Sequence, residues 1–298
     1  MIIYFLLIVT LLFASWSVAA ILRFCQPDAP QLLLAVFLAA FIHLYGAWVL
    51  VSVYAKYVFD FCFLVALVYA VSRSRDNIKR SKLKTVSNLF FGSIFAILSL
   101  LYFTGTAGKP AGIAELQLPF RSGSYFVFQG GKGLPANVFH YKLRGAVFAM
   151  DLVKLNAAGN RAKHIFSEKL SDYEIYNDTL YSPCDGSVAH TNDGNPDNIP
   201  PDRKRGPTNT NSILLETGSM YVFMAHLKPG SILVKEGEVV KAGQPLARCG
   251  NSGFSIEPHL HIQAHAKTNP VLPWYREKPL LIQFNGRFYN LFETIKSE

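Results

Sequence analysis

Four long apolar segments occupy the first third of this 298-residue chain, and they constrain its fold more than any other feature. They are residues 1–22, 31–54, about 55–72 and about 86–104. Each is close to the roughly 20 apolar residues that an α-helix needs to cross a bilayer. We therefore expect residues 1–104 to form a bundle of four transmembrane helices. A cleaved signal peptide is the alternative for residues 1–22, but no basic segment precedes this run and three further apolar segments follow it.

The charge of this first third predicts how it lies in the membrane. Residues 1–104 carry eight Lys/Arg against three Asp/Glu, and six of the eight basic residues lie in the loop 73–84. Basic clusters of this kind mark cytoplasmic loops, so we expect residues 105–298 and the N-terminus to lie outside the cytoplasm. Because topology accounts for the basic cluster, the net charge of +9 does not indicate nucleic-acid binding.

Two ionisable residues, Asp60 and His43, lie inside the apolar segments. Ionisable groups in a membrane span can mark a functional site. Asp60 lies near one end of its segment, and His43 has no obvious partner in the sequence. We therefore expect an interfacial Asp60 and a His43 that packs between helices.

After a link at residues 105–119, the sequence of residues 120–298 changes to short alternating segments separated by Gly, Pro, Asn and Asp. This pattern is typical of strands and turns and predicts a mainly antiparallel β domain. Residues 193–211 are polar and contain four prolines, which favours a surface loop. A disulfide between Cys184 and Cys249 is a hypothesis that an oxidising compartment would permit. The expected strands are 124–130, 146–155, 179–183, 186–192, 212–218, 221–227, 231–235, 245–250 and 258–265.

Three histidines lie close together in the last of these strands, at His259, His261 and His265. On an extended strand all three point to one face, with about 6.6 Å between the first two and about 13 Å between His261 and His265. Two of them can therefore serve one site and the third cannot. We expect His265, like His164 and His190, to be a surface residue or a bystander. An HxH strand by itself is only a weak sign of metal binding.

Other residues of the same half could complete a site. Asp151 interrupts the apolar strand 146–155, where an unpaired carboxylate is costly to bury, so a metal or a cationic partner is expected unless the strand end is solvated. His140 precedes it by eleven residues, a distance that a loop could close. His226 follows an alternating strand, where an imidazole could act as a general acid or base, or stabilise an oxyanion.

The order of these elements resembles a known family. Residues 224–262 combine an AHL strand, a VxxGxxVxxGQ hairpin, a GNSG turn and a terminal HLH, and residues 181–190 contain an APxDGxV-like strand. This arrangement closely resembles the lysostaphin/LytM-type zinc metallopeptidases over roughly residues 120–270. The resemblance implies a β-rich domain that binds one Zn²⁺ ion per chain and cleaves peptide bonds in bacterial peptidoglycan. The four apolar segments take no part in it.

Carried over residue by residue, the resemblance makes Asp151 and His261 zinc ligands and His226 and His259 the catalytic pair. The chain departs from the usual HxGxD motif, because no histidine stands four residues before Asp151. Asn137, His140 and residues 149–151 instead resemble a variant pattern of the same family, which makes His140 the third ligand, with His164 in reserve.

Together these inferences predict a metallopeptidase of the bacterial inner membrane whose C-terminal domain faces the cell wall. Glu257, next to the HxH strand, could support the site, although a solvated turn residue is the simpler interpretation. No glutamate is placed like the base of an HExxH helix. The alternative is a non-catalytic LytM-like module that binds the wall or regulates a partner amidase. The sequence identifies no protein partner.

Overall fold

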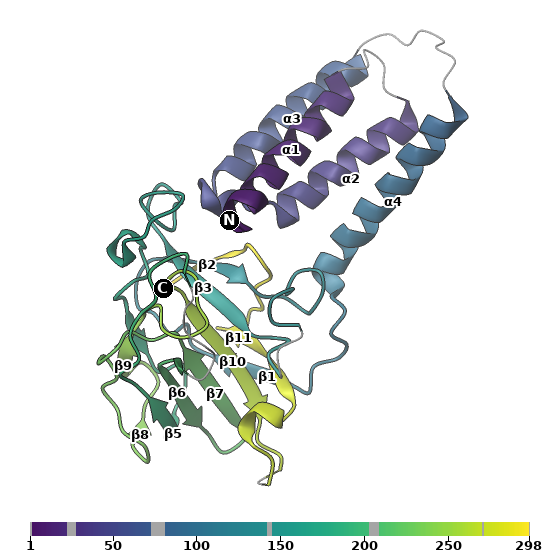
Figure 1. Cartoon of the computed structure of the whole chain (residues 1–298). Helices are drawn as coiled ribbons and strands as arrows, with labels where there is room; N and C mark the ends of the chain where they lie inside the picture. Colours follow the sequence, from purple (N-terminus) through teal and green to yellow (C-terminus); the bar gives the residue numbers. More distant parts are fainter. Residues whose placement is uncertain are drawn as a thin grey trace. The chain divides into compact units, whose positions relative to one another are not determined.

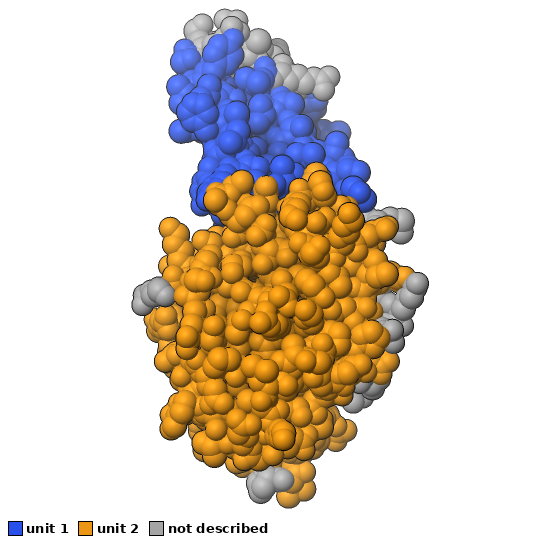
Figure 2. All heavy atoms as spheres, turned by 90° about the vertical axis from the view of Figure 1, so that its left-hand side faces the viewer, with its two compact units in different colours: residues 1–104 blue, residues 105–298 orange. Residues whose placement is uncertain are grey.

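The computed structural model describes residues 2–22, 28–72, 81–141, 145–202, 209–269 and 271–297. The chain divides into two compact units, residues 1–104 and residues 105–298 (Figures 1 and 2). Each unit has its own hydrophobic core. They are therefore described separately.

The described part of the first unit contains four α-helices, as the apolar segments predict. Three of them are long and apolar enough to cross a membrane, and α2, at 17 residues, is shorter. Most residues of the expected cytoplasmic loop, 73–80, lie outside the described residues. The bounds are α1 Ile2–Leu22, α2 Ala29–Tyr45, α3 Ala55–Ser72 and α4 Lys82–Thr104.

The second helix ends nine residues earlier than the apolar run 31–54 predicts. Gly46 is extended at φ −65° and ψ 132°, and its N–H still donates to the carbonyl of Ile42. The indole Nε1 of Trp48 donates to the same carbonyl at 3.0 Å, so a side chain takes part in ending the helix. A short 3-10 helix, η1 (Trp48–Leu50), then leads towards α3.

His43 and Asp60 form a pair that the sequence did not reveal. His43 Nδ1 lies 2.8 Å from Asp60 Oδ2, which joins α2 to α3. A buried or lipid-facing charge is stabilised by such pairing, so the expectation that His43 lacks a partner was wrong.

The second unit is a mainly antiparallel β domain, which confirms the predicted fold class. Within the described residues the main sheet runs β12-β2-β3-β10-β7-β6-β5-β8, and β11 joins β1 to β10 (Figure 1). Each pair in it is antiparallel except β1 with β11. A second sheet pairs β4 with β9. The bounds are β1 Ile113–Leu116, β2 Ser124–Gln129, β3 Met150–Leu155, β4 Thr179–Tyr181, β5 Gly186–Asn192, β6 Ser212–Glu216, β7 Met220–Ala225, β8 Val239–Val240, β9 Pro245–Arg248, β10 Leu260–Ala266, β11 Pro279–Phe284 and β12 Thr294–Lys296.

Strand β10 lies in the middle of the sheet, between β3 and β7. Six of its seven residues are buried. Leu260, Ile262 and Ala264 belong to the hydrophobic core, while the residues that alternate with them are polar. Because neighbouring residues of a strand point to opposite faces, one face of β10 supports the core and the other carries His261, Gln263 and His265.

The structure differs from the sequence-based expectations at several places of this unit, and β8, β11 and β12 lie outside the expected strands. Residues 146–149 precede β3 as turns instead of extending it, and residues 231–235 form no strand. β1 falls within the expected link 105–119. Cys184 and Cys249 are free thiols, so the hypothetical disulfide is not formed.

Candidate metal centre

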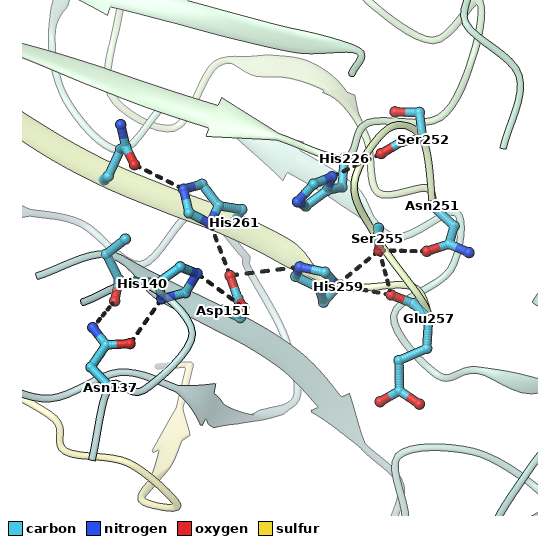
Figure 3. A network of polar contacts seen from close by, with 12 residues as sticks. Asn137, His140, Asp151, His226, Asn251, Ser252, Ser255, Glu257, His259 and His261 are labelled. Atoms are coloured by element: carbon cyan, nitrogen blue, oxygen red, sulfur yellow. Dashed lines mark hydrogen bonds and ion pairs between the residues drawn. The ribbon is translucent and has the colours of Figure 1, made fainter. Parts of the chain in front are cut away.

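The candidate site lies where β3, β10 and β7 run side by side (Figure 3). Asp151 of β3 is the direct cross-strand partner of His261 on β10, and His261 is in turn opposite Ala225 of β7. Facing residues of antiparallel strands put their side chains on the same side of the sheet. His226 follows β7 directly and His259 precedes β10 directly. Strand pairing therefore gathers four of the five residues singled out from the sequence.

Asp151 is the centre of this group. Its carboxylate lies 2.9 Å from His261 Nδ1, 3.3 Å from His140 Nε2 and 3.6 Å from His259 Nε2. Burial opposes ionisation of this carboxyl group, but electrostatic attraction to the neighbouring histidines and their hydrogen bonds hold the pKa of Asp151 well below its usual range. It is buried and paired, so the solvated strand end considered above is wrong.

His140 reaches the site from the loop that precedes β3. Asn137 connects this loop to the strand, because its amide Nδ2 donates to the carbonyls of Val147 and Ala149 at 3.1 and 3.0 Å. Its Oδ1 lies 2.8 Å from His140 Nδ1 and turns the opposite nitrogen towards Asp151. His140 is 4% exposed, so a residue named from an unusual spacing is part of the buried cluster. His164, the reserve candidate, is exposed, and so is His190.

His226 has a left-handed backbone conformation, with φ 67°. This conformation is uncommon for a residue with a side chain, and it often occurs at functional sites. Its Nδ1 lies 2.8 Å from the carbonyl oxygen of Ser252. Burial, together with the neighbouring His259 and His261, holds the pKa of His226 well below its ordinary value. The ring is therefore neutral, with Nδ1 as the donor.

His259 is held by the turn before β10. Its Nδ1 lies 2.8 Å from the carbonyl oxygen of Glu257 and 3.2 Å from the hydroxyl of Ser255. The carboxylate of Glu257 points elsewhere and binds Arg161 at 2.8 Å through both oxygens. Each side chain of this ion pair is only 2% exposed, so the interpretation of Glu257 as a solvated turn residue was wrong.

His265 is not a surface residue. It is fully buried, and Gln263 lies between it and His261 along the same face of β10. The separation along the strand correctly predicts that His265 does not contact the cluster directly. It does not reveal the hydrogen bonds that connect His265 to His261 through Gln263. The signal was available in the sequence, because residues 261, 263 and 265 alternate and so share one face.

His140, Asp151 and His261 fit a metal ion. One donor atom from each lies within 4.8 Å of the other two. A tetrahedral zinc site with ligand bonds of about 2.0–2.2 Å has about 3.4 Å between its ligand atoms, close to the separations from Asp151. Two imidazole nitrogens and one carboxylate oxygen are also a donor set that zinc prefers.

The cluster opens into a cavity of about 360 Å³. His140, Asp151, His226, His259 and His261 all line it. A group bound there could therefore reach the metal-binding atoms and both further imidazoles. The other described lining residues include four aromatic rings, those of Phe128, Phe139, Phe223 and Phe254.

Comparison with known proteins identifies a region that carries part of this site. The family model "Peptidase family M23" matches residues 171–273. A curated relative, the peptidoglycan DD-endopeptidase ShyB of Vibrio cholerae serotype O1 (strain ATCC 39315 / El Tor Inaba N16961), is 35% identical over 68 residues. That match covers 23% of this chain and only 16% of the relative.

Solved structures of the same class are also similar. A zinc-containing peptidase from Vibrio cholerae shares 25% identity over 37% of this chain and 26% of its own, with a TM-score of 0.26. The catalytic domain of lysostaphin from Staphylococcus simulans shares 18% identity over 50% of this chain and 83% of its own, with a TM-score of 0.28. Because these TM-scores are low, the assignment depends on the sequence matches.

The family match includes His226, His259 and His261 and begins after His140 and Asp151. It starts beyond the segment in which this chain lacks the usual HxGxD spacing. Residues 171–273 of this chain therefore match the M23 peptidase family, and the lysostaphin/LytM-type resemblance is confirmed.

Proposed function

We propose that the chain is a membrane-anchored zinc metallopeptidase that hydrolyses peptide bonds in peptidoglycan. The observation that carries this proposal is the convergence of His140, Asp151 and His261 beside His226 and His259 in one cavity. The M23 match supports the peptidase class. The name of the curated relative, a peptidoglycan endopeptidase, supports the substrate.

In this proposal three residues bind the metal and two others accept and donate protons. His140, Asp151 and His261 would be the zinc ligands. Zinc in such a site polarises a carbonyl group and makes water acidic enough to attack near neutral pH. None of the described lining residues is a glutamate, so imidazoles must accept and donate the protons.

His226 and His259 are prepared for this task by their backbone partners. A carbonyl oxygen can only accept a hydrogen bond, so Nδ1 of each ring carries the proton. His226 Nδ1 donates a hydrogen bond to the carbonyl oxygen of Ser252, and His259 Nδ1 donates one to that of Glu257. Each Nε2 then keeps a lone pair, and the two rings lie 4.5 Å apart, centre to centre. One Nε2 can take a proton from the attacking water, and a protonated ring can stabilise the oxyanion or protonate the leaving amine.

The helical unit supports the membrane anchor. Large apolar side chains are exposed on all four helices, among them Phe5, Leu33, Phe61 and Phe90. Monomeric soluble proteins rarely expose so much apolar surface, whereas helices in a bilayer must expose it. With the basic loop 73–84 in the cytoplasm, the β unit would lie on the outer side of the bacterial inner membrane, facing the cell wall.

The test uses the full chain, purified in detergent, loaded with zinc and incubated with peptidoglycan. Mass analysis should detect peptides released by amide cleavage. His261→Ala should lose both zinc and cleavage, whereas His259→Ala should lose cleavage and retain zinc. Zinc-loaded wild type that binds the wall but releases no fragment would support the non-catalytic module instead. Equal cleavage by wild type and His259→Ala would contradict the proposed mechanism.

A further inference from the structure

Two buried carboxamides, Asn137 and Gln263, contact the two histidines of the candidate metal centre. Asn137 is fully buried and Gln263 is 6% exposed. Each places an amide oxygen against the ring nitrogen that faces away from Asp151. The other hydrogen-bond partners of each amide fix its orientation, and this determines which nitrogen of the histidine ring carries the proton.

On the His140 side the amide orientation is fixed by the backbone. The two acceptors of Asn137 Nδ2 are the carbonyls of Val147 and Ala149, and a flipped amide would set its oxygen against both. Oδ1 therefore faces His140 Nδ1, which must carry the proton to donate to it. Nε2, the atom next to Asp151, is then the nitrogen of His140 that a metal ion would bind.

On the His261 side a longer chain of hydrogen bonds has the same effect. Glu277 offers its carbonyl oxygen 2.9 Å from His265 Nδ1, so this nitrogen is the donor. His265 Nε2 then accepts from Gln263 Nε2 at 3.3 Å, and Gln263 Oε1 accepts from His261 Nε2 at 3.0 Å. The proton of His261 is thus held on Nε2, and its Nδ1 faces Asp151 at 2.9 Å.

Burial excludes the opposite direction of donation along this series of hydrogen bonds. A flipped Gln263 would need a proton on His265 Nε2 in addition to the one on Nδ1, which makes a charged imidazolium. His265 is 0% exposed, and burial lowers its pKa. The ring also packs edge-on against Trp274, with centroids 5.4 Å apart. The Glu277 side chain, which accepts from Thr268 and Asn269, fixes the segment that supplies the last acceptor.

We propose that Asn137, Gln263 and His265 are positioning residues that select the metal-binding nitrogen of each ligand histidine, Nε2 in His140 and Nδ1 in His261. This inference rests on the proposed zinc site. The two ligands enter the site in opposite ring orientations, and outer hydrogen bonds of opposite placement hold a proton on the far nitrogen of each ring, so that the nitrogen facing Asp151 is the one that a metal ion would bind. Such outer partners typically change metal affinity about 10- to 100-fold when they are removed.

The first test needs no variant. Nitrogen-15 NMR of the histidine rings in the full chain, with and without Zn²⁺, distinguishes protonated from metal-bound nitrogens. We expect zinc on His140 Nε2 and His261 Nδ1, with protons on the other two nitrogens. The same nitrogen bound in both rings would overturn the proposal. Absence of zinc binding by wild type would overturn both this inference and the proposed function.

The second test compares two substitutions of similar size at Gln263. Gln263→Met removes the acceptor for His261 Nε2–H, whereas Gln263→Glu keeps one. Zinc affinity, measured by competition with a chelating dye, should fall about 10- to 100-fold in the first. It should stay closer to wild type in the second. Co²⁺ absorption spectra of each variant report the ligand geometry without reference to cleavage.

Gln283→Met is the matched control, because Gln283 lies on β11 and is not among the described residues of the cavity. It should bind zinc like wild type. Equal zinc affinity of Gln263→Met and wild type would overturn this inference while leaving the proposed function intact. If Gln263→Met does not fold, the ring-nitrogen assignment in wild type decides the question.

Discussion

The ion pair of Arg161 and Glu257 supports the candidate site from outside the cavity. Both side chains are buried, and the carbonyl oxygen of Glu257 holds His259. Arg161 Nη2 also donates to the carbonyl of Ile165 at 3.2 Å. The pair therefore fastens the segment around residues 161–165 to the turn that precedes β10.

Removing one charge of this pair should destabilise the β unit. Glu257→Gln leaves the guanidinium of Arg161 buried without its counter-charge, which typically costs about 3–5 kcal/mol of unfolding free energy. Thermal and urea unfolding of the detergent-solubilised chain measure this loss. The control is Asp185→Asn, which breaks the exposed contact to Lys241 and should change stability little. Equal effects of the two substitutions would contradict the structural role given to Arg161 and Glu257.

A substitution of His226 can test proton transfer separately from metal binding. Asparagine tolerates the left-handed backbone of this position better than most residues, so His226→Asn should fold. We expect cleavage to fall by about 10²–10⁴-fold, because a proton-transfer group is lost. Zinc content should be unchanged, since His226 is not one of the three ligands. Loss of zinc in this variant would assign His226 to the metal instead.

Sequence patterns located the site residues better than they located the contacts that hold them. Asp151 stands out as a carboxylate inside an apolar strand, and HLH places two histidines on one face of a strand, although alone it is a weak sign of metal binding. His140 could be named only from a resemblance, because its approach depends on Asn137 bridging two carbonyls. The backbone partner of His265, Glu277, and the side-chain partner of Glu257, Arg161, come from other segments, and no local pattern shows such contacts.

At the scale of elements, β10 organises the β unit. It pairs with β7 along most of its length, with β3 near its start and with β11 near its end, so the site and the core share one strand. Most strands could be predicted from alternation and turn residues. The early end of α2 could not, because residues 46–54 remain apolar and the end depends on the Trp48 side chain reaching back to Ile42.

The two faces of β10 should respond differently to substitution. Leu260 is fully buried and points to the core, away from the metal side. Leu260→Ala should lower the free energy of unfolding by about 2–5 kcal/mol, as cavity-forming substitutions do, and should leave zinc affinity of the folded protein near wild type. Thermal unfolding and dye competition measure the two properties. Leu233→Ala, at a side chain 67% exposed, is the control and should alter neither.

At the scale of the whole molecule, an apolar helical unit is joined to a polar β unit that carries the site. The division at residue 104 coincides with the change from long apolar runs to short alternating strands. Composition could therefore predict the architecture of each unit. It could not predict the pair His43–Asp60, because residues 17 positions apart meet only when α2 and α3 pack.

The membrane orientation can be tested with reporter fusions. A reporter enzyme that is active only outside the cytoplasm should be active when fused after residue 298. The same reporter inserted in the loop 73–84 should be inactive, because that loop is expected in the cytoplasm. A cytoplasmic fluorescent reporter should give the reverse pattern. Activity of the first reporter at both positions would contradict the proposed orientation.

The position of β10 also affects when the site can form during synthesis. Asp151 and His261 are 110 residues apart in sequence, and β10 lies between β3 and β7, which both precede it in the chain. Until β10 is inserted, β3 and β7 have no shared partner and Asp151 lacks its facing ligand. A partly made chain therefore carries an incomplete candidate metal site, and its three candidate ligands can come together only after β10 has been made.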